Sequence, residues 1–202
     1  MSDLRLKDVR AYLEESGNEL LSEVSRARQV LHEAVPGGWT IAQIVHHLVR
    51  TEQVMYLVWA AVPKIRRFPR LLGAIDRTNT GLWRLMGMRT VESINGSLTP
   101  SNAAEGRFRT PLFLRPVSSK KSLEELIEWR RSTRNQSWRA ISSVGEDTLN
   151  TVSWSHPLLG SYTLMEFAQF LGIHESHHLP QIRRIRALHL LRSDDARPVP
   201  FS

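Results

Sequence analysis

Apolar residues recur at helical spacing along this sequence, and this periodicity constrains the fold more than any other feature. In the first periodic stretch the apolar stripe consists of Leu13, Leu20, Leu21, Val24 and Leu31. Residues three or four positions apart lie on one face of a helix, so each such stretch can bury one side against its neighbours. Four amphipathic stretches with one long connection predict an all-α fold, a four-helix bundle.

Start and stop signals place the four helices along the chain. We expect them over residues 6–34, 40–62, 122–144 and 163–191. Thr40 is a favourable N-cap for the second helix, and Pro63 is expected to end it. Ser122 and Thr163 each precede a glutamate by three positions, which is the pattern of a capping box. These signals predict where the third and fourth helices begin.

The chain of 202 residues is expected to form one domain over residues 1–202, because domains commonly contain about 100–200 residues. A long crossover over residues 63–118 joins the second and third helices. Connections of that length are unusual in compact domains, so we predict a functional cover with some helix of its own. Residues 151–162 are expected to form extended chain or a short hairpin. Residues 192–202 are expected to form a C-terminal tail.

Composition narrows the classes of function. The sequence contains no cysteine, which leaves His, Asp and Glu as candidate metal ligands and excludes a cysteine nucleophile. Its longest apolar stretch, residues 54–63, is about half of the ~20 residues that a membrane span requires. The charged N-terminus lacks the apolar segment of a secretory signal, so we expect a cytoplasmic protein without a membrane segment.

The net charge of +7 and the pI of about 10.5 raise the question of nucleic-acid binding. The basic residues are scattered among many acidic ones, and no recognition motif accompanies them. Basic stretches of this kind are usually solvated faces of a folded domain. Nucleic acid is therefore not an expected partner.

Three histidines lie close together in the predicted fourth helix, in the stretch that begins His174-Glu175 and ends His177-His178. Helical phase places His174 and His178 on the apolar face, four positions apart, where two imidazoles can share one ion. His177 falls at the edge of that face and Glu175 at its other flank. The letters spell the zinc-protease motif H-E-x-x-H, but the position of Glu175 and the nearby Pro180 indicate a coincidence.

A third inward histidine is expected from the second helix. His47 borders its apolar face, whereas His46 points in nearly the opposite direction. Glu52 falls within the apolar stripe, where a carboxylate needs a partner. Two roles for Glu52 stay open: it orients a ligand imidazole or metal-bound water, or it pairs with an arginine such as Arg130 or Arg131.

The two histidine-bearing segments resemble the DinB-like (DinB/YfiT) superfamily. Residues 37–52 are similar to the family's signature of Trp-Thr/Ser followed by His-Leu-x-x-x-Glu, and residues 156–182 to its Gly-x-x-Thr and His-x-x-x-His-x-x-Gln-Ile segment. The resemblance implies a four-helix bundle, commonly a homodimer, with a metal held by His47, His174 and His178. Helical phase selects the same three residues.

A three-histidine site leaves open positions on a divalent ion, as catalytic sites do. Zn²⁺ is the simplest choice, and Ni²⁺, Fe²⁺ and Mn²⁺ also suit the ligands. Such an ion can activate water or a bound thiol. The resemblance implies hydrolysis, thiol S-transfer with a low-molecular-weight thiol, or thiol-assisted isomerisation. We therefore predict a metal-dependent transferase or hydrolase that acts on a small molecule. The alternative is a non-catalytic, stress-related metal-binding bundle.

Overall fold

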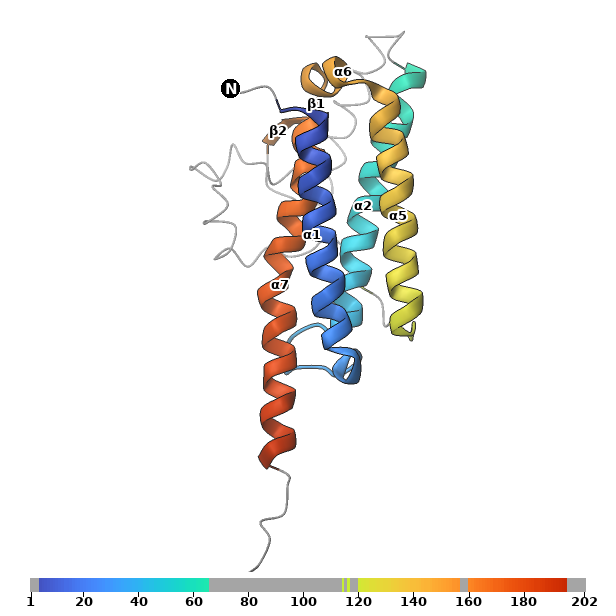
Figure 1. Cartoon of the computed structure of the whole chain (residues 1–202). Coiled ribbons are helices and arrows are strands. Elements are labelled where there is room, and N and C mark those ends of the chain that lie inside the picture. Colours follow the sequence, from blue (N-terminus) through green and yellow to red (C-terminus); the bar gives the residue numbers. More distant parts are fainter. Residues whose placement is uncertain (1–3, 66–113, 115, 117–119, 157–159, 196–202) are drawn as a thin grey trace, which may run out of the picture.

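The computed structural model describes residues 4–65, 114, 116, 120–156 and 160–195. Within these residues four long helices run side by side (Figure 1), namely α1 (Leu6–Arg26), α2 (Ile41–Ile65), α5 (Leu123–Val144) and α7 (Leu164–Asp195). The shorter elements are the 3-10 turn η1 (Arg28–Val30), the helix α6 (Glu146–Thr151), and the strands β1 (Ser153–His156) and β2 (Gly160–Thr163). The predicted all-α four-helix bundle is confirmed.

Local sequence signals set the helix starts. The Ser122 hydroxyl accepts a hydrogen bond from the Glu125 N–H, and the Glu125 carboxylate accepts one from the Ser122 N–H. Thr163 and Glu166 make the same reciprocal pair before α7. Both capping boxes satisfy backbone donors that a helix start would otherwise leave unpaired. Both predicted starts are therefore confirmed.

The first helix is shorter than expected. α1 ends at Arg26, whereas the apolar stripe had predicted a helix to residue 34. After η1 the chain turns back, and the N–H of Ala42 donates to the carbonyl of Leu31 over 3.0 Å. Leu31 is buried, and Val35 packs against the same apolar cluster. Tertiary packing of this turn, rather than a local stop signal, ends the helix.

The second and fourth predicted helices are longer than expected. Pro63 lies inside α2, which continues to Ile65, so the prediction that Pro63 ends the helix is wrong. A proline removes one intrahelical hydrogen bond, and in the last turn the helix tolerates that loss. α7 likewise contains Pro180 and continues to Asp195, so the first residues of the predicted tail are helical. The hairpin expected at residues 151–162 is present as antiparallel β1 and β2.

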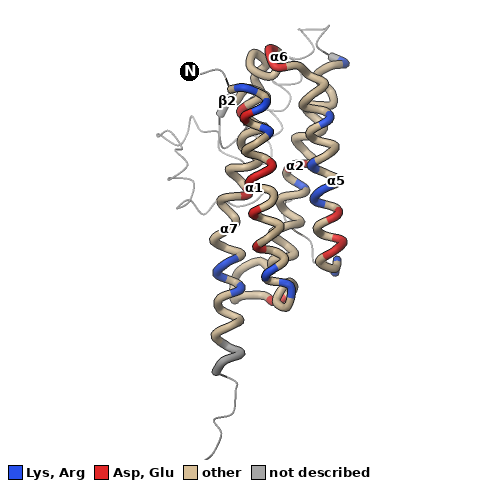
Figure 2. The backbone as a smooth tube through the Cα atoms, in the orientation of Figure 1, with Lys and Arg blue, Asp and Glu red and all other residues tan. Residues whose placement is uncertain are grey.

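The predicted cover, residues 63–118, lies outside the described residues apart from the end of α2, Leu114 and Pro116. Among the described helices, none combines the length and the apolar character needed to cross a membrane. Along α5 the acidic residues occupy the first turns and the basic residues follow them, whereas α1 carries both kinds along its length (Figure 2). Neither helix carries charges of a single sign, in line with the mixed charges of the sequence.

The bundle consists of two helix pairs, because α1 packs mainly against α7 and α2 mainly against α5. Two apolar clusters fill its core. One holds Leu20, Val49, Leu126 and Leu179, and the other holds Leu13, Met55, Ile141 and Leu171, among others. Along each helix the two clusters leave a gap, and buried polar side chains occupy it: Ser16, Thr51, Glu52, Arg130, Thr133, Ser137 and Glu175. The core therefore contains a polar layer at its middle.

Candidate metal centre

Three histidines from two helices meet in or beside this polar layer. His47 comes from α2, and His174 and His178 come from successive turns of α7. The Nε2 atoms of His47 and His178 each lie 3.2 Å from the Nε2 atom of His174. One ring nitrogen from each residue falls within 4.8 Å of the others. The three nitrogens therefore surround a space of the size of one ion.

Hydrogen bonds on the far side of two rings fix their tautomers. Nδ1 of His47 lies 2.9 Å from the carbonyl oxygen of Leu114, and Nδ1 of His178 lies 3.0 Å from Oε1 of Gln181. Both partners are oxygens that only accept, so each Nδ1 carries the proton and donates it. In a neutral imidazole the other nitrogen, Nε2, then has a lone pair. Two lone pairs therefore point at His174.

The residues present fit a divalent cation. A neutral His174 can donate its Nε2 proton to only one of the two lone pairs that face it, so the cluster cannot satisfy itself completely. Two nitrogens at about 2.0–2.1 Å from a tetrahedral ion lie about 3.4 Å apart. The observed separations of 3.2 Å are close to this value. The donor set, and the separations of His47 and His178 from His174, therefore fit a three-histidine metal site.

Burial keeps the rings in the form that binds metal. The exposed fractions of His47 and His178 are 6% and 8%. Burial lowers the pKa of His47, and it lowers the pKa of His178 to about 4, although the hydrogen bond to Gln181 works in the opposite direction. Both imidazoles are therefore neutral near pH 7. Neutral histidine is the form that ligates a metal, so binding need not displace a proton from either ring.

Aromatic side chains wall the cluster. The Trp39 ring centroid lies 5.1 Å from that of His47 and 6.4 Å from that of His178. Phe170 stacks on His174 with centroids 5.4 Å apart. Rings packed in this way restrict the rotation of the imidazoles and shield part of the site from water. The three histidine rings are thereby held in place by their neighbours.

The other neighbouring histidines stay outside the cluster. His177 is exposed and touches only the edge of the His178 ring, with centroids 5.5 Å apart. His46 lies against Trp129 of α5, with centroids 5.3 Å apart. The structure thus brings together the three histidines that helical phase selected and separates the two that it rejected.

Glu52 is 2% exposed and pairs with arginines. Its Oε2 lies 2.9 Å from Nη1 of Arg130, and its Oε1 lies 2.9 Å from Nε of Arg134. These contacts favour the second of the two roles considered for Glu52, with Arg130 as one partner. Arg131, the other arginine considered, is exposed, and the sequence reasoning missed Arg134. A role of Glu52 beside the metal stays a prediction.

Glu175 belongs to the same ion-pair cluster. Its Oε1 contacts Nη2 of Arg130 and of Arg134, and its Oε2 accepts a hydrogen bond of 2.7 Å from the Ser16 hydroxyl. The sequence placed Glu175 at the flank of the inward face, yet it is 2% exposed. Its carboxylate is fully engaged by these partners, which agrees with the interpretation of H-E-x-x-H as a coincidence. Two arginines four positions apart on α5 were the signal that could have revealed the cluster.

Comparison with known proteins places the chain in a family. A family model described as the DinB superfamily matches residues 5–182, a range that includes all three histidines and both glutamates. Searches of curated proteins and of solved structures give no match. The family match extends over most of the sequence, over the whole of α1, α2 and α5 and over α7 as far as residue 182. The chain belongs to the DinB superfamily.

Proposed function

We propose that the protein is a metal-dependent enzyme in which His47, His174 and His178 hold one divalent ion. The reaction is thiol S-transfer or hydrolysis on a small molecule. The observation that supports this most strongly is the convergence of three Nε2 atoms, two of which are fixed as lone-pair donors. A bound ion would supply Lewis acidity that favours the ionised form of a thiol or a water molecule.

The residues of the chain orient and shield the site. Leu114 and Gln181 hold the His47 and His178 rings with Nε2 turned inward. Three protein ligands leave room for a substrate, which is the arrangement of catalytic sites rather than closed structural ones. Since the chain has no cysteine, the thiol in an S-transfer would come from outside the chain, and the family resemblance supports a low-molecular-weight thiol. Leu114 belongs to the predicted crossover, where we place substrate selection.

The identity of the ion and the assembly are further parts of the proposal. Zn²⁺ is the simplest ion for three imidazoles, with Ni²⁺, Fe²⁺ and Mn²⁺ as the other ions that this ligand type accepts. The family resemblance supports a homodimer. The second candidate function is a non-catalytic metal-binding bundle. It is favoured by one observation, that the ligands come from both helix pairs, so that an ion would tie the pairs together.

Metal content per chain tests the site. We would purify the protein without a metal-binding tag and compare wild type with the variants His47→Ala, His174→Ala and His178→Ala. His177→Ala is the matched control, because His177 lies on the same helix and is exposed. We expect about one equivalent in wild type and in the control, and loss in the other three. A wild type that takes up neither Zn²⁺ nor Ni²⁺ would overturn the proposal.

Removal of the ion separates the two candidate functions. If the centre is catalytic, the protein without metal keeps its helical circular dichroism, and azide or a small thiol changes the visible spectrum of the Co²⁺ form. If the ion is structural, its removal unfolds the bundle and added thiols leave the Co²⁺ spectrum unchanged. The first result would justify a screen of thiols with electrophilic substrates.

A further inference from the structure

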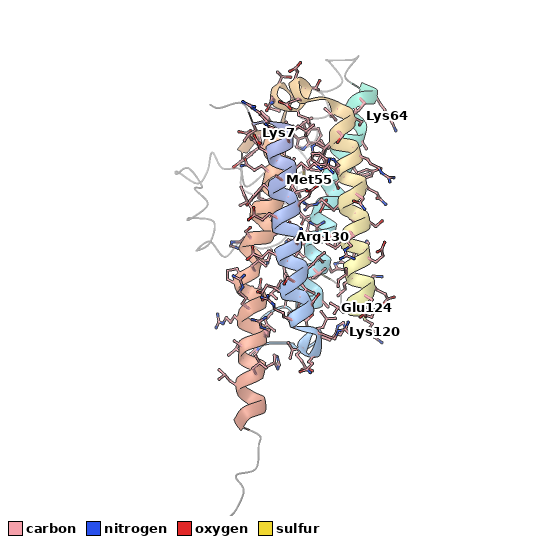
Figure 3. The ribbon with its side chains drawn as sticks, viewed as in Figure 1. Lys7, Met55, Lys64, Lys120, Glu124 and Arg130 are labelled. Atoms are coloured by element: carbon pink, nitrogen blue, oxygen red, sulfur yellow. The ribbon has the colours of Figure 1, made fainter. Side chains whose placement is uncertain are left out.

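Arg130 of α5 lies at mid-height in the bundle, between the levels of Met55 and Glu124 (Figure 3). Its guanidinium contacts carboxylates on two different helices. Nη1 lies 2.9 Å from Oε2 of Glu52 on α2, and Nη2 contacts Oε1 of Glu175 on α7. The planar, forked guanidinium can bind two carboxylates at once, which a single ammonium group does less well. Arg130 therefore bridges α2 and α7.

Both carboxylates lie close in sequence to candidate metal ligands. Glu175 directly follows His174, and Glu52 follows His47 by five positions on the same helix. The ligands come from different helix pairs, because α2 packs mainly against α5 and α7 mainly against α1. The distance between His47 and the two α7 histidines thus depends on how the pairs sit against each other. The bridge therefore spans the junction of the two helix pairs.

Arg134 and Ser16 complete the ion-pair cluster. Arg134 places Nε 2.9 Å from Glu52 and Nη2 3.2 Å from Glu175, and its Nη1 donates to the carbonyl of Leu13 over 3.1 Å. Ser16 donates to Glu175 from α1. Two positive charges therefore face two negative ones, and all four helices contribute a contact. Burial lowers the pKa of Arg130 to about 10, which still leaves the guanidinium charged at neutral pH.

We propose that Arg130, together with Arg134, is a positioning residue of the metal centre. By binding Glu52 and Glu175 at once, the arginines fix α2 against α7 and so set the separation of His47 from His174 and His178. The inference rests on the proposed metal centre and deepens it. It predicts that the arginines control metal affinity and coordination geometry without touching the ion.

Co²⁺ binding by Arg130→Met tests the inference. Neighbours that orient metal ligands typically change metal affinity by about 10–100-fold, and we expect a loss in this range together with an altered visible Co²⁺ spectrum. Arg131→Met is the matched control, since Arg131 is the adjacent, exposed arginine on α5. Affinity and spectrum are measured where circular dichroism shows each variant fully folded. A role in folding alone would lower stability but leave both readouts unchanged.

Two further variants keep the test decisive. The double variant Glu52→Gln/Arg130→Met removes one charge of each sign, so the charges of the ion-pair cluster stay balanced. This variant can therefore be measured even if Arg130→Met does not fold. Arg130→Lys keeps the positive charge but not the forked geometry of the guanidinium. Compared with Arg130→Met, we expect it to restore folding stability more than metal affinity. A folded Arg130→Met or double variant with wild-type affinity and spectrum would overturn the inference alone. A wild type that binds no Co²⁺ would overturn the metal centre and this inference with it.

Discussion

The histidine cluster and the ion-pair cluster share one layer of the core, but they balance their polar atoms in different ways. The histidine cluster turns neutral nitrogens toward one point, and its own protons cannot satisfy them all. The ion-pair cluster matches Glu52 and Glu175 with Arg130 and Arg134, and Ser16 supplies a further donor. The histidine cluster thus leaves a lone pair without a proton, whereas the ion-pair cluster matches its charges within the chain, although Nε of Arg130 has no hydrogen-bond partner among the described residues.

Because of this difference, we expect the ion-pair cluster to contribute mainly to folding stability and the histidine cluster mainly to metal binding. A cluster that is balanced internally makes its largest contribution to the folded state, because loss of one member leaves an uncompensated charge in the core. A cluster that awaits a cation should affect the empty protein less and the loaded protein more. The two kinds of cluster lie on adjacent residues, His174 and Glu175, so substitutions one position apart should have opposite consequences.

The largest effect is expected from breaking the ion-pair cluster. Glu175→Gln keeps the shape of the side chain but leaves Arg130 and Arg134 with one carboxylate between them. Breaking a buried pair by removing one partner costs about 3–5 kcal/mol. We expect a loss of this size in the free energy of unfolding of the metal-free protein, measured by urea denaturation followed by circular dichroism.

Glu19→Gln is the control for this prediction. Glu19 of α1 pairs with Arg183 of α7 over 2.7 Å, so this ion pair also joins two helices, but both side chains are about half exposed. Exposed pairs contribute little to stability, so we expect almost no change. Equal stability of Glu175→Gln and Glu19→Gln would show that the cluster is not the structural centre described above.

The fold could be predicted where the signals are local. The stripes of apolar residues and the capping boxes at Ser122 and Thr163 act within a few positions, and both starts were found. The end of α1 could not be predicted, because it depends on the packing of Leu31 and Val35 against distant helices. The prediction that Pro63 ends the second helix failed for the opposite reason, because this strong local signal has little effect in the last turn of α2.

The candidate site, too, has features that local sequence signals predict and features that depend on tertiary packing. Helical phase groups His174 and His178, because a spacing of four positions is a property of one helix, and it turns His47 toward the apolar face of its own helix. That His47 meets the other two depends on how α2 packs against α7. The proton on His47 could not be inferred, since it depends on the carbonyl of Leu114, 67 positions away. Glu52 stood out as a carboxylate in an apolar stripe. Its second partner, Arg134, depends on how α5 is rotated against α2, which the sequence does not show.

A smaller effect, confined to binding, is expected at Gln181. Its Oε1 accepts the Nδ1 proton of His178 over 3.0 Å and so keeps Nε2 free for the ion. We expect Gln181→Leu to weaken metal binding by about 10–100-fold, as losses of such partners do. Competition with a chromophoric chelator measures the metal affinity of this variant and of wild type.

Gln181→Glu sharpens the same comparison. A carboxylate is a stronger acceptor than an amide oxygen, and carboxylate–histidine–metal chains are common, so this variant should bind metal at least as tightly as wild type. Neither substitution should lower the stability of the metal-free protein as Glu175→Gln does. Wild-type metal affinity in Gln181→Leu would show that Gln181 does not contribute to the site.

The smallest effect is expected where α1 approaches α7. A Cβ atom on Gly172 would lie 2.5 Å from Cε1 of Tyr12 and 3.1 Å from Oγ of Ser16, the residue that donates to Glu175. Alanine in place of a helical glycine gains up to about 1 kcal/mol, whereas overpacking costs about 1–3 kcal/mol. We therefore expect Gly172→Ala to lose about 1 kcal/mol of unfolding free energy.

The Tyr12→Ala background distinguishes crowding from other causes. Tyr12 is half-buried, so its ring is the part of the contact that can be removed most easily. Once it is gone, the same Gly172→Ala change should become neutral or stabilising in urea denaturation, because the gain in helix propensity remains and the clash does not. Metal affinity should change little in either background, since the histidines meet between α2 and α7. A loss of stability that persists without Tyr12 would place the strain elsewhere in the contact, at Ser16 and the hydrogen bond that it makes to the ion-pair cluster.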